Sequence, residues 1–152
     1  MKEFKTIDDI LDFAINEEQK AADLYAGLAE KSRDREIREV FLQFSQEELG
    51  HKKKLQSIKG GGVVALPEKK VTDLKIGDYL VDVDKTRGDL SYQESLIVAM
   101  KEEKAAFRLY SDLASRTDHP ALKETFSMLA QEEARHKLRF EIEYDDYILK
   151  EN

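Results

Sequence analysis

The chain has 152 residues, which fits one domain, and a chain of this length buries roughly 70% of its unfolded surface when it folds. Charged residues make up 38% of it, and 32 acidic against 25 basic residues give a formal charge of −7, which argues against nucleic acid or an anionic membrane as a partner. There is no cysteine, so disulfides, zinc–thiolate sites and iron–sulfur clusters are excluded, and any metal must be held by Glu, Asp and His.

The sequence also predicts a location in the cell. No apolar run approaches the roughly 20 residues that a helix needs to span a bilayer. The first ten residues, MKEFKTIDDI, carry acids and no apolar segment of the kind found in signal peptides. We therefore expect a cytoplasmic protein with no membrane partner.

Two helices are predicted in the first half of the chain. The first spans about 6–31, with Thr6 or Asp8 as its N-cap. The second spans about 35–58 and ends at the three glycines 60–62, since glycine commonly ends a helix. The connection between them is only a few residues long, so these helices must be antiparallel neighbours.

Two further helices are predicted in the second half. One spans about 91–116, with Ser91 as N-cap and Glu94 completing a capping box, and the other begins with a proline and spans about 120–149. A long connection, about 59–90, joins the two helix pairs and can cover the roughly 40 Å length of a helix. We therefore predict an all-α four-helix bundle of two antiparallel hairpins joined by a long crossover.

The two halves are copies of one another. When the sequence is shifted by 85 positions, residues 11–52 align with 96–137 without a gap, and 16 of the 42 aligned positions are identical. Chance would give about 3, at a typical residue frequency near 7%. We interpret residues 1–152 as a single domain with an internal repeat over 6–58 and 91–149.

The first and third helices each carry a glutamate in the middle of an apolar stripe. The residues three, four and seven positions away from Glu18, and likewise from Glu103, are all apolar or aromatic. An isolated ionised carboxylate in such a place would cost many kcal/mol. These two carboxylates must therefore be neutralised, paired or bound to a metal.

The second and fourth helices each carry a Glu-x-x-His motif on their inner face. Packing the four helices together would bring four carboxylates and two imidazoles into one central layer. This layer would contain Glu18, Glu48, His51, Glu103, Glu133 and His136. Carboxylate and neutral imidazole ligands suit iron, manganese or zinc. Six ligands shared by two metal ions would leave coordination positions free for oxygen species.

A second glutamate precedes each of these four. The four extra residues are Glu17, Glu47, Glu102 and Glu132. Those on the second and fourth helices have basic neighbours on the same face, which indicates a position facing solvent or just outside the ligands. Those on the first and third helices have largely apolar neighbours, and whether one of them joins the site stays open. We assign the ligands to Glu18 and Glu103 because each lies seven residues before a tyrosine.

The segments EEQKAADLY with EELGH, and EEKAAFRLY with EEARH, resemble the rubrerythrins and the wider ferritin-like di-iron carboxylate proteins. The resemblance covers both halves and leaves out only the crossover. It implies a ferritin-like bundle, two iron ions held by the six side chains above (with Mn or Zn as substitutes), and hydrogen bonds from Tyr25 and Tyr110 to ligand carboxylates. It also implies a homodimer that reduces hydrogen peroxide or dioxygen.

The sequence departs from the rubrerythrin pattern in two ways. Many rubrerythrins carry a rubredoxin domain that feeds electrons to the iron pair, whereas this chain has no cysteine, so we expect a separate electron-donor protein. Rubrerythrins proper also have an extra glutamate ligand one turn beyond the third-helix glutamate, where this chain has Ala106 and Phe107. That difference leaves an oxidase or ferroxidase reaction open.

Three functions therefore stay open. The first is a di-iron oxidoreductase that turns over peroxide or dioxygen. The second is an iron-handling protein whose site oxidises Fe(II) for storage or delivery. The third is a metal-free interaction bundle, which would require the central carboxylates to be protonated or paired.

Overall fold

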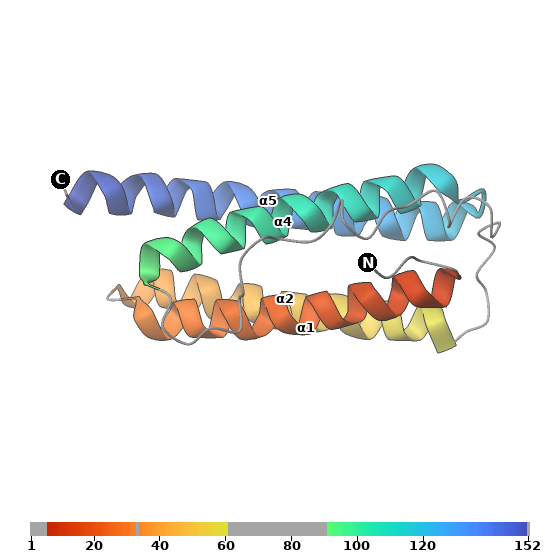
Figure 1. Cartoon of the computed structure of the whole chain (residues 1–152), viewed down its shortest axis with the longest axis horizontal. Helices are drawn as coiled ribbons and strands as arrows, with labels where there is room; N and C mark the ends of the chain where they lie inside the picture. The colour runs from red at the N-terminus through yellow and green to blue at the C-terminus, as the bar shows by residue number, and fades with distance from the viewer. Residues whose placement is uncertain (1–5, 33, 61–90, 152) are drawn as a thin grey trace.

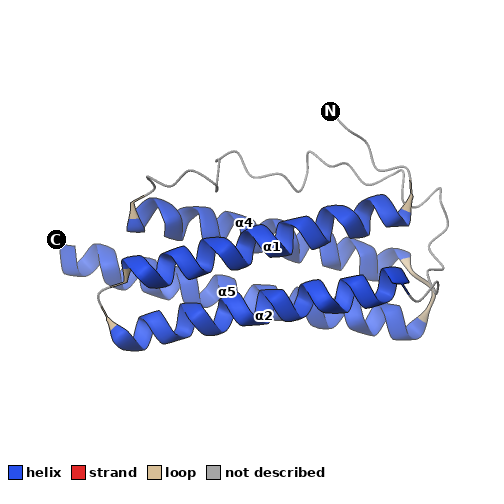
Figure 2. Cartoon of the chain, turned by 90° about the horizontal axis from the view of Figure 1, so that it is seen from below, coloured by secondary structure: helices blue, strands red, loops and turns tan. Residues whose placement is uncertain are grey.

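The computed structural model describes residues 6–32, 34–60 and 91–151, which form four helices. These are α1 (Ile7–Lys31), α2 (Arg35–Gly60), α4 (Tyr92–Arg116) and α5 (Pro120–Glu151). Helix α1 packs against α2 and α4 against α5 as antiparallel hairpins, and the hairpins meet where α1 contacts α4 (Figures 1 and 2). The predicted all-α four-helix bundle is confirmed. Most of the predicted crossover 59–90 lies outside the described residues.

The bundle has no helix suited to a bilayer within its described part. None of α1, α2, α4 and α5 combines the length with the apolar character that crossing a membrane requires.

Capping boxes begin the two helices that carry the inward glutamates. The Thr6 hydroxyl accepts a 3.1 Å hydrogen bond from the backbone N–H of Asp9, and the Asp9 carboxylate accepts one of 3.1 Å from the Thr6 N–H. Ser91 and Glu94 make the same pair of contacts. These bonds satisfy N–H groups that have no partner within the helix. Because Thr6 and Ser91 are related by the 85-residue offset, α1 and α4 begin at equivalent points of the repeat.

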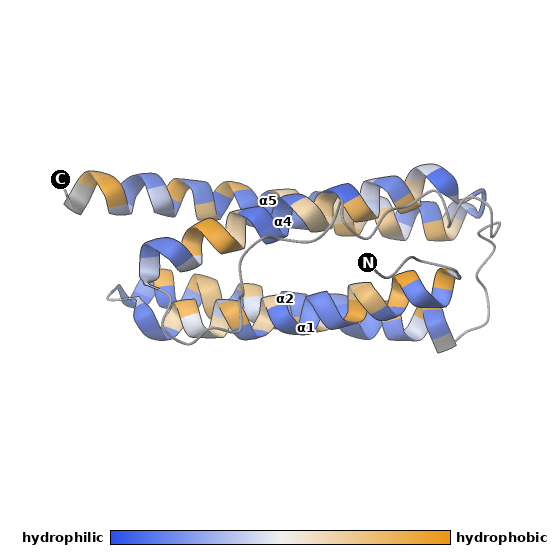
Figure 3. Cartoon of the chain, in the orientation of Figure 1, coloured by the Kyte–Doolittle hydropathy of each residue, from blue (hydrophilic) through white to orange (hydrophobic). Residues whose placement is uncertain are grey.

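The hydrophobic core is divided into two clusters, one toward each end of the bundle. One cluster contains Leu11 of α1 and Phe126 of α5, and the other contains Phe41 of α2 and Phe140 of α5. In every helix, the sequence between the residues of the two clusters holds buried polar side chains. Figure 3 shows hydrophilic residues midway along α1 and α4, with more apolar stretches on either side. The fold therefore encloses a polar layer across its middle.

Phe140 tests how much the second cluster contributes to stability. Its side chain is fully buried, and its ring centroid lies 4.8 Å from that of Tyr25 and 5.4 Å from that of Phe41. Phe140→Ala should lower the free energy of unfolding by about 3–5 kcal/mol, because it opens a cavity among these rings. Leu138→Ala, at a residue that is 58% exposed, should change it by less than about 0.5 kcal/mol. Urea denaturation of both variants checks this, and equal losses would contradict it.

Candidate metal centre

Six side chains from all four helices meet in the polar layer. Each is at most 5% exposed. They form two groups of four, and within each group one potential ligand atom per residue lies within 4.8 Å of the others. The groups are Glu18, Glu48, His51 and Glu133, and Glu48, Glu103, Glu133 and His136. The structure thus brings together all six residues that the sequence singled out, and Glu17 and Glu102 belong to neither group.

Two carboxylates are common to both groups. Glu48 comes from α2 and Glu133 from α5, and the 85-residue offset relates them. Each carboxylate has two oxygens, so Glu48 and Glu133 can each offer one oxygen to either group. Glu18 of α1 and Glu103 of α4 each belong to one group only. This division would suit two neighbouring cations, with Glu48 and Glu133 available to both and Glu18 and Glu103 each available to one.

Both imidazoles direct Nδ1 toward carboxylates of the layer. His51 Nδ1 lies 3.0 Å from Glu133 Oε1 and 3.5 Å from Glu18 Oε2. His136 Nδ1 lies 2.8 Å from Glu48 Oε1 and 3.7 Å from Glu103 Oε1. The shortest of these contacts joins α2 and α5 in both cases. Nδ1 is therefore the nitrogen that each histidine can offer to a metal.

The layer contains polar atoms that the protein itself leaves unsatisfied. Five buried atoms in the described part of the chain make no hydrogen bond, and all five belong to the layer: Glu18 Oε2, Glu48 Oε2, His51 Nδ1, Glu103 Oε2 and Glu133 Oε1. A buried polar group without a partner costs about 1–3 kcal/mol, and more when it is charged. Two imidazoles also cannot neutralise four carboxylates. Divalent cations that accept oxygen and nitrogen ligands, such as iron, manganese or zinc, fit this set of donors.

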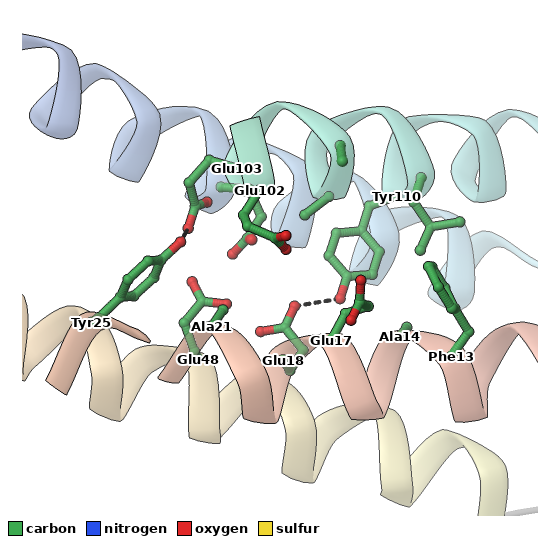
Figure 4. Close-up of a pocket in the computed structure, with 14 residues that line it drawn as sticks. Phe13, Ala14, Glu17, Glu18, Ala21, Tyr25, Glu48, Glu102, Glu103 and Tyr110 are labelled. Atoms are coloured by element: carbon green, nitrogen blue, oxygen red, sulfur yellow. Dashed lines mark hydrogen bonds between the residues drawn. The ribbon is translucent and has the colours of Figure 1, made fainter. Parts of the chain in front are cut away.

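Two tyrosines fix the carboxylates that belong to a single group. The Tyr25 hydroxyl donates to Glu103 Oε1, and the Tyr110 hydroxyl donates to Glu18 Oε1 (Figure 4). Each tyrosine therefore reaches across to the glutamate of the opposite hairpin. Burial, together with the negative charge of the nearby carboxylates, raises the pKa of both tyrosines well above the ordinary value. The hydroxyls consequently stay protonated and act as donors.

Without a metal, the layer holds protons that glutamates normally release. Burial, reinforced by neighbouring carboxylates, raises the pKa of Glu48 and Glu133 well above the ordinary 4.5. Burial also raises the pKa of Glu103, to about 8, despite its hydrogen bond from Tyr25. Glu18 is the exception, because its interactions with Glu48 and His51 outweigh burial and lower its pKa.

The two imidazoles differ in their affinity for a proton. For His51, burial lowers the pKa, but the contacts with Glu133 and Glu18 prevail and raise it to about 11. For His136, burial prevails and lowers the pKa below its ordinary value, although Glu133 and Glu47 act in the opposite direction. The metal-free layer is therefore electrically asymmetric even though its residues are related by a repeat.

A small cavity lies against the layer between α1 and α4. The volume open to the centre of a water-sized molecule is about 20 Å³, enough for roughly one such molecule. Ala14, Ala21 and Ala106 line it, and so do Glu17 and Glu102 (Figure 4). Glu17 and Glu102, left open by the sequence, thus face the cavity beside the site.

The remaining two glutamates have a contact that the sequence did not predict specifically. Glu132 Oε2 lies against His51 Nε2, and Glu47 Oε1 lies 3.4 Å from His136 Nε2. Each imidazole thus has a carboxylate of the opposite hairpin on the nitrogen that faces away from the layer. The sequence left open whether Glu47 and Glu132 face solvent or lie just outside the ligands. In the structure, both lie just outside the ligands, against the histidines.

The sequence matches the rubrerythrin family model over residues 9–144, which is most of the chain. The chain belongs to the rubrerythrin family. A crystal structure from Thermotoga maritima, assigned as a ferritin-like diiron-carboxylate protein, superposes with a TM-score of 0.77 at 22% sequence identity. The match covers 97% of this chain and 99% of that one, and it shows that the two share a fold. No curated protein matches this member of the rubrerythrin family.

The metal-free protein should lose stability as the pH rises. Between pH 4.5 and about 8, the folded state keeps a proton on Glu103 that the unfolded chain has released, and His51 behaves likewise from 6.5 to about 11. Because the folded state binds more protons over this range, the free energy of unfolding falls with increasing pH. Glu18 and His136 contribute in the opposite sense, Glu18 only as the pH falls through 4.5 and His136 as it falls through 6.5. Above pH 5 the opposing group, His136, is outweighed by His51 and the three glutamates whose pKa is raised, Glu48, Glu103 and Glu133. Thermal melts of chelator-treated protein from pH 5 to 9 should therefore show a decreasing Tm.

Glu103→Gln provides the control for this prediction. The amide keeps the shape of the side chain but cannot take up or release the proton, so Tm should decrease less steeply with pH than in the parent protein. A Tm that rises over this range, or identical slopes for the two proteins, would contradict the prediction.

Proposed function

We propose that this protein is a di-iron oxidoreductase that reduces hydrogen peroxide or dioxygen with electrons from an external donor. The observation that carries the proposal is the pair of overlapping ligand groups that share Glu48 and Glu133. Two metal ions held close together can stabilise two oxygen atoms of one small reacting molecule at the same time. Membership of the rubrerythrin family supports iron as the metal.

Six residues would hold the two ions. Glu18 and His51 would hold one, Glu103 and His136 the other, and Glu48 and Glu133 would contribute to both. Ferrous iron bound there would supply two electrons, one from each ion, which together with two protons are what the reduction of one hydrogen peroxide to two waters requires.

The protein's own side chains would prepare the site for this chemistry. The hydroxyls of Tyr25 and Tyr110 each occupy one oxygen of Glu103 and Glu18, leaving the second oxygen, which has no hydrogen bond, facing the layer. The rings of Phe41 and Phe126 pack in the two clusters that close the layer from either end, which keeps bulk water out. The cavity between α1 and α4, with room for about one water-sized molecule, would be the point at which a small oxidant approaches the layer.

The electrons must reach the site from elsewhere. These 152 residues contain no cysteine, so an iron–sulfur centre that re-reduces the site would have to lie outside them. We therefore propose a separate electron-donor protein as the partner.

An iron-handling role is the second candidate. The observation that favours it is Ala106, which lines the cavity one turn beyond Glu103, where the resemblance to rubrerythrins calls for an additional glutamate ligand. Without that ligand, the site could oxidise Fe(II) with dioxygen and release the product for storage or delivery. A protein that stores iron as mineral must assemble many subunits into a cage, so the size of the assembly separates this candidate from a dimeric enzyme.

Reoxidation kinetics would decide between the two candidates. The protein would be loaded with Fe(II) under anaerobic conditions and mixed with hydrogen peroxide or with dioxygen at equal concentration in a stopped-flow instrument. We expect the ferric absorption to appear several-fold faster with peroxide, and size-exclusion chromatography to give a dimer. A preference for dioxygen together with a large multi-subunit assembly would instead establish the iron-handling role.

A further inference from the structure

We infer that the two metal positions are unequal, and that the position at His51 binds a divalent cation more tightly than the position at His136. The inference rests on the proposed metal-binding function and concerns residues outside the six ligands. It follows from a difference between the two halves of the repeat. The difference lies next to the two carboxylates, Glu132 and Glu47, that contact Nε2 of His51 and of His136.

Glu132 and Glu47 are equivalent positioning residues in the two halves. Glu132 of α5 lies against His51 Nε2, and Glu47 of α2 lies against His136 Nε2. A carboxylate in this position holds the proton on Nε2, fixes the orientation of the ring and makes Nδ1 a stronger electron donor to a metal. Removing such a partner typically costs about 10–100-fold in metal affinity.

The repeat is broken at the residue before the second histidine. Arg135 donates from Nη2 to Glu47 Oε1, the same oxygen that faces His136 Nε2. The equivalent residue in the first half is Gly50, which has no side chain, and no lysine or arginine in the described part of the chain pairs with Glu132, whose ion-pair partner is His51. The positive charge of Arg135 partly neutralises the Glu47 carboxylate. Glu47 is therefore a weaker hydrogen-bond acceptor for His136 than Glu132 is for His51.

A second difference between the halves is an aromatic ring, Phe44, that keeps Arg135 close to His136. Arg135 Cζ lies 5.8 Å from the ring centroid of Phe44, and the Phe44 ring stacks on His136 with centroids 4.0 Å apart. The residue equivalent to Phe44 in the repeat is Leu129, which offers no aromatic face. The positive charge of Arg135 therefore stays near the His136 position and repels a cation there. Both differences weaken the same position.

A competition titration with Zn(II) and a chromophoric chelator tests this inference, because zinc binds without redox chemistry. The wild-type protein should bind two ions in two resolved steps, with affinities that differ by on the order of tenfold. His51→Ala should remove the tighter step. Arg135→Gln should strengthen the weaker step and bring the two closer together.

Gly50→Arg introduces the missing charge on the other side. A Cβ at Gly50 meets nothing within 4 Å, so a side chain can be added there, and by the symmetry of the repeat its guanidinium would reach Glu132. This substitution should weaken the tighter step, whereas Gly50→Gln, which adds a side chain without a charge, should not.

The outcomes separate this inference from the proposed function. Two wild-type steps of equal affinity, or steps that neither Arg135→Gln nor Gly50→Arg changes, would overturn the inference while leaving a two-metal site in place. A wild-type protein that binds no metal would overturn both.

Discussion

The structure depends on four carboxylates buried in one layer across the middle of the bundle. Neither half of the hydrophobic core provides positive charge for them, and the two histidines can neutralise only part of their charge. Burying unpaired charge is among the most costly events in folding. A pair of divalent cations would supply the missing charge and bind the five polar atoms that have no hydrogen bond. In the absence of metal, the same layer must retain protons, which accounts for the raised pKa values of Glu48, Glu103 and Glu133.

Duplication explains how such a layer is built. The principal contacts of the site join different hairpins: Tyr25 reaches Glu103, Tyr110 reaches Glu18, and each histidine contacts glutamates of the opposite half. One hairpin alone supplies two glutamates and one histidine, with none of these cross-hairpin partners. The layer is therefore complete only when the two halves pack together, which couples formation of the site to formation of the core.

Much of this arrangement could be predicted from the sequence because helices have a fixed period. Spacing of three, four and seven residues placed Glu18 and Glu103 on the buried faces, and the repeat carried the Glu-x-x-His motif from Glu48 to Glu133. The cap at Thr6 could not be separated from Asp8 by pattern alone, because both residue types cap helices well. The structure decides for Thr6 through the bonds that it exchanges with Asp9.

Contacts between the hairpins were harder to predict. The contacts of Glu47 and Glu132 with the histidines depend on how the hairpins are rotated relative to each other. From their basic neighbours, such as Arg135, the sequence indicated a position either facing solvent or just outside the ligands and did not separate the two. The position of Glu17 and Glu102 was also hard to predict. Both line a cavity that forms only when the helices pack together, so the sequence pattern alone does not indicate it. The crossover 59–90 falls mostly outside the described residues, so its predicted path across the bundle stays a prediction.

The central claim is that this layer holds two metal ions. The most direct measurement is the metal content of the protein after anaerobic loading with Fe(II) and removal of excess metal, determined by elemental analysis. We predict two ions per chain, and their loss in the double variant Glu18→Ala/Glu103→Ala but not in Glu30→Ala/Glu124→Ala, which removes two exposed glutamates. A protein that retains no metal, or a double variant that keeps both ions, would contradict the claim.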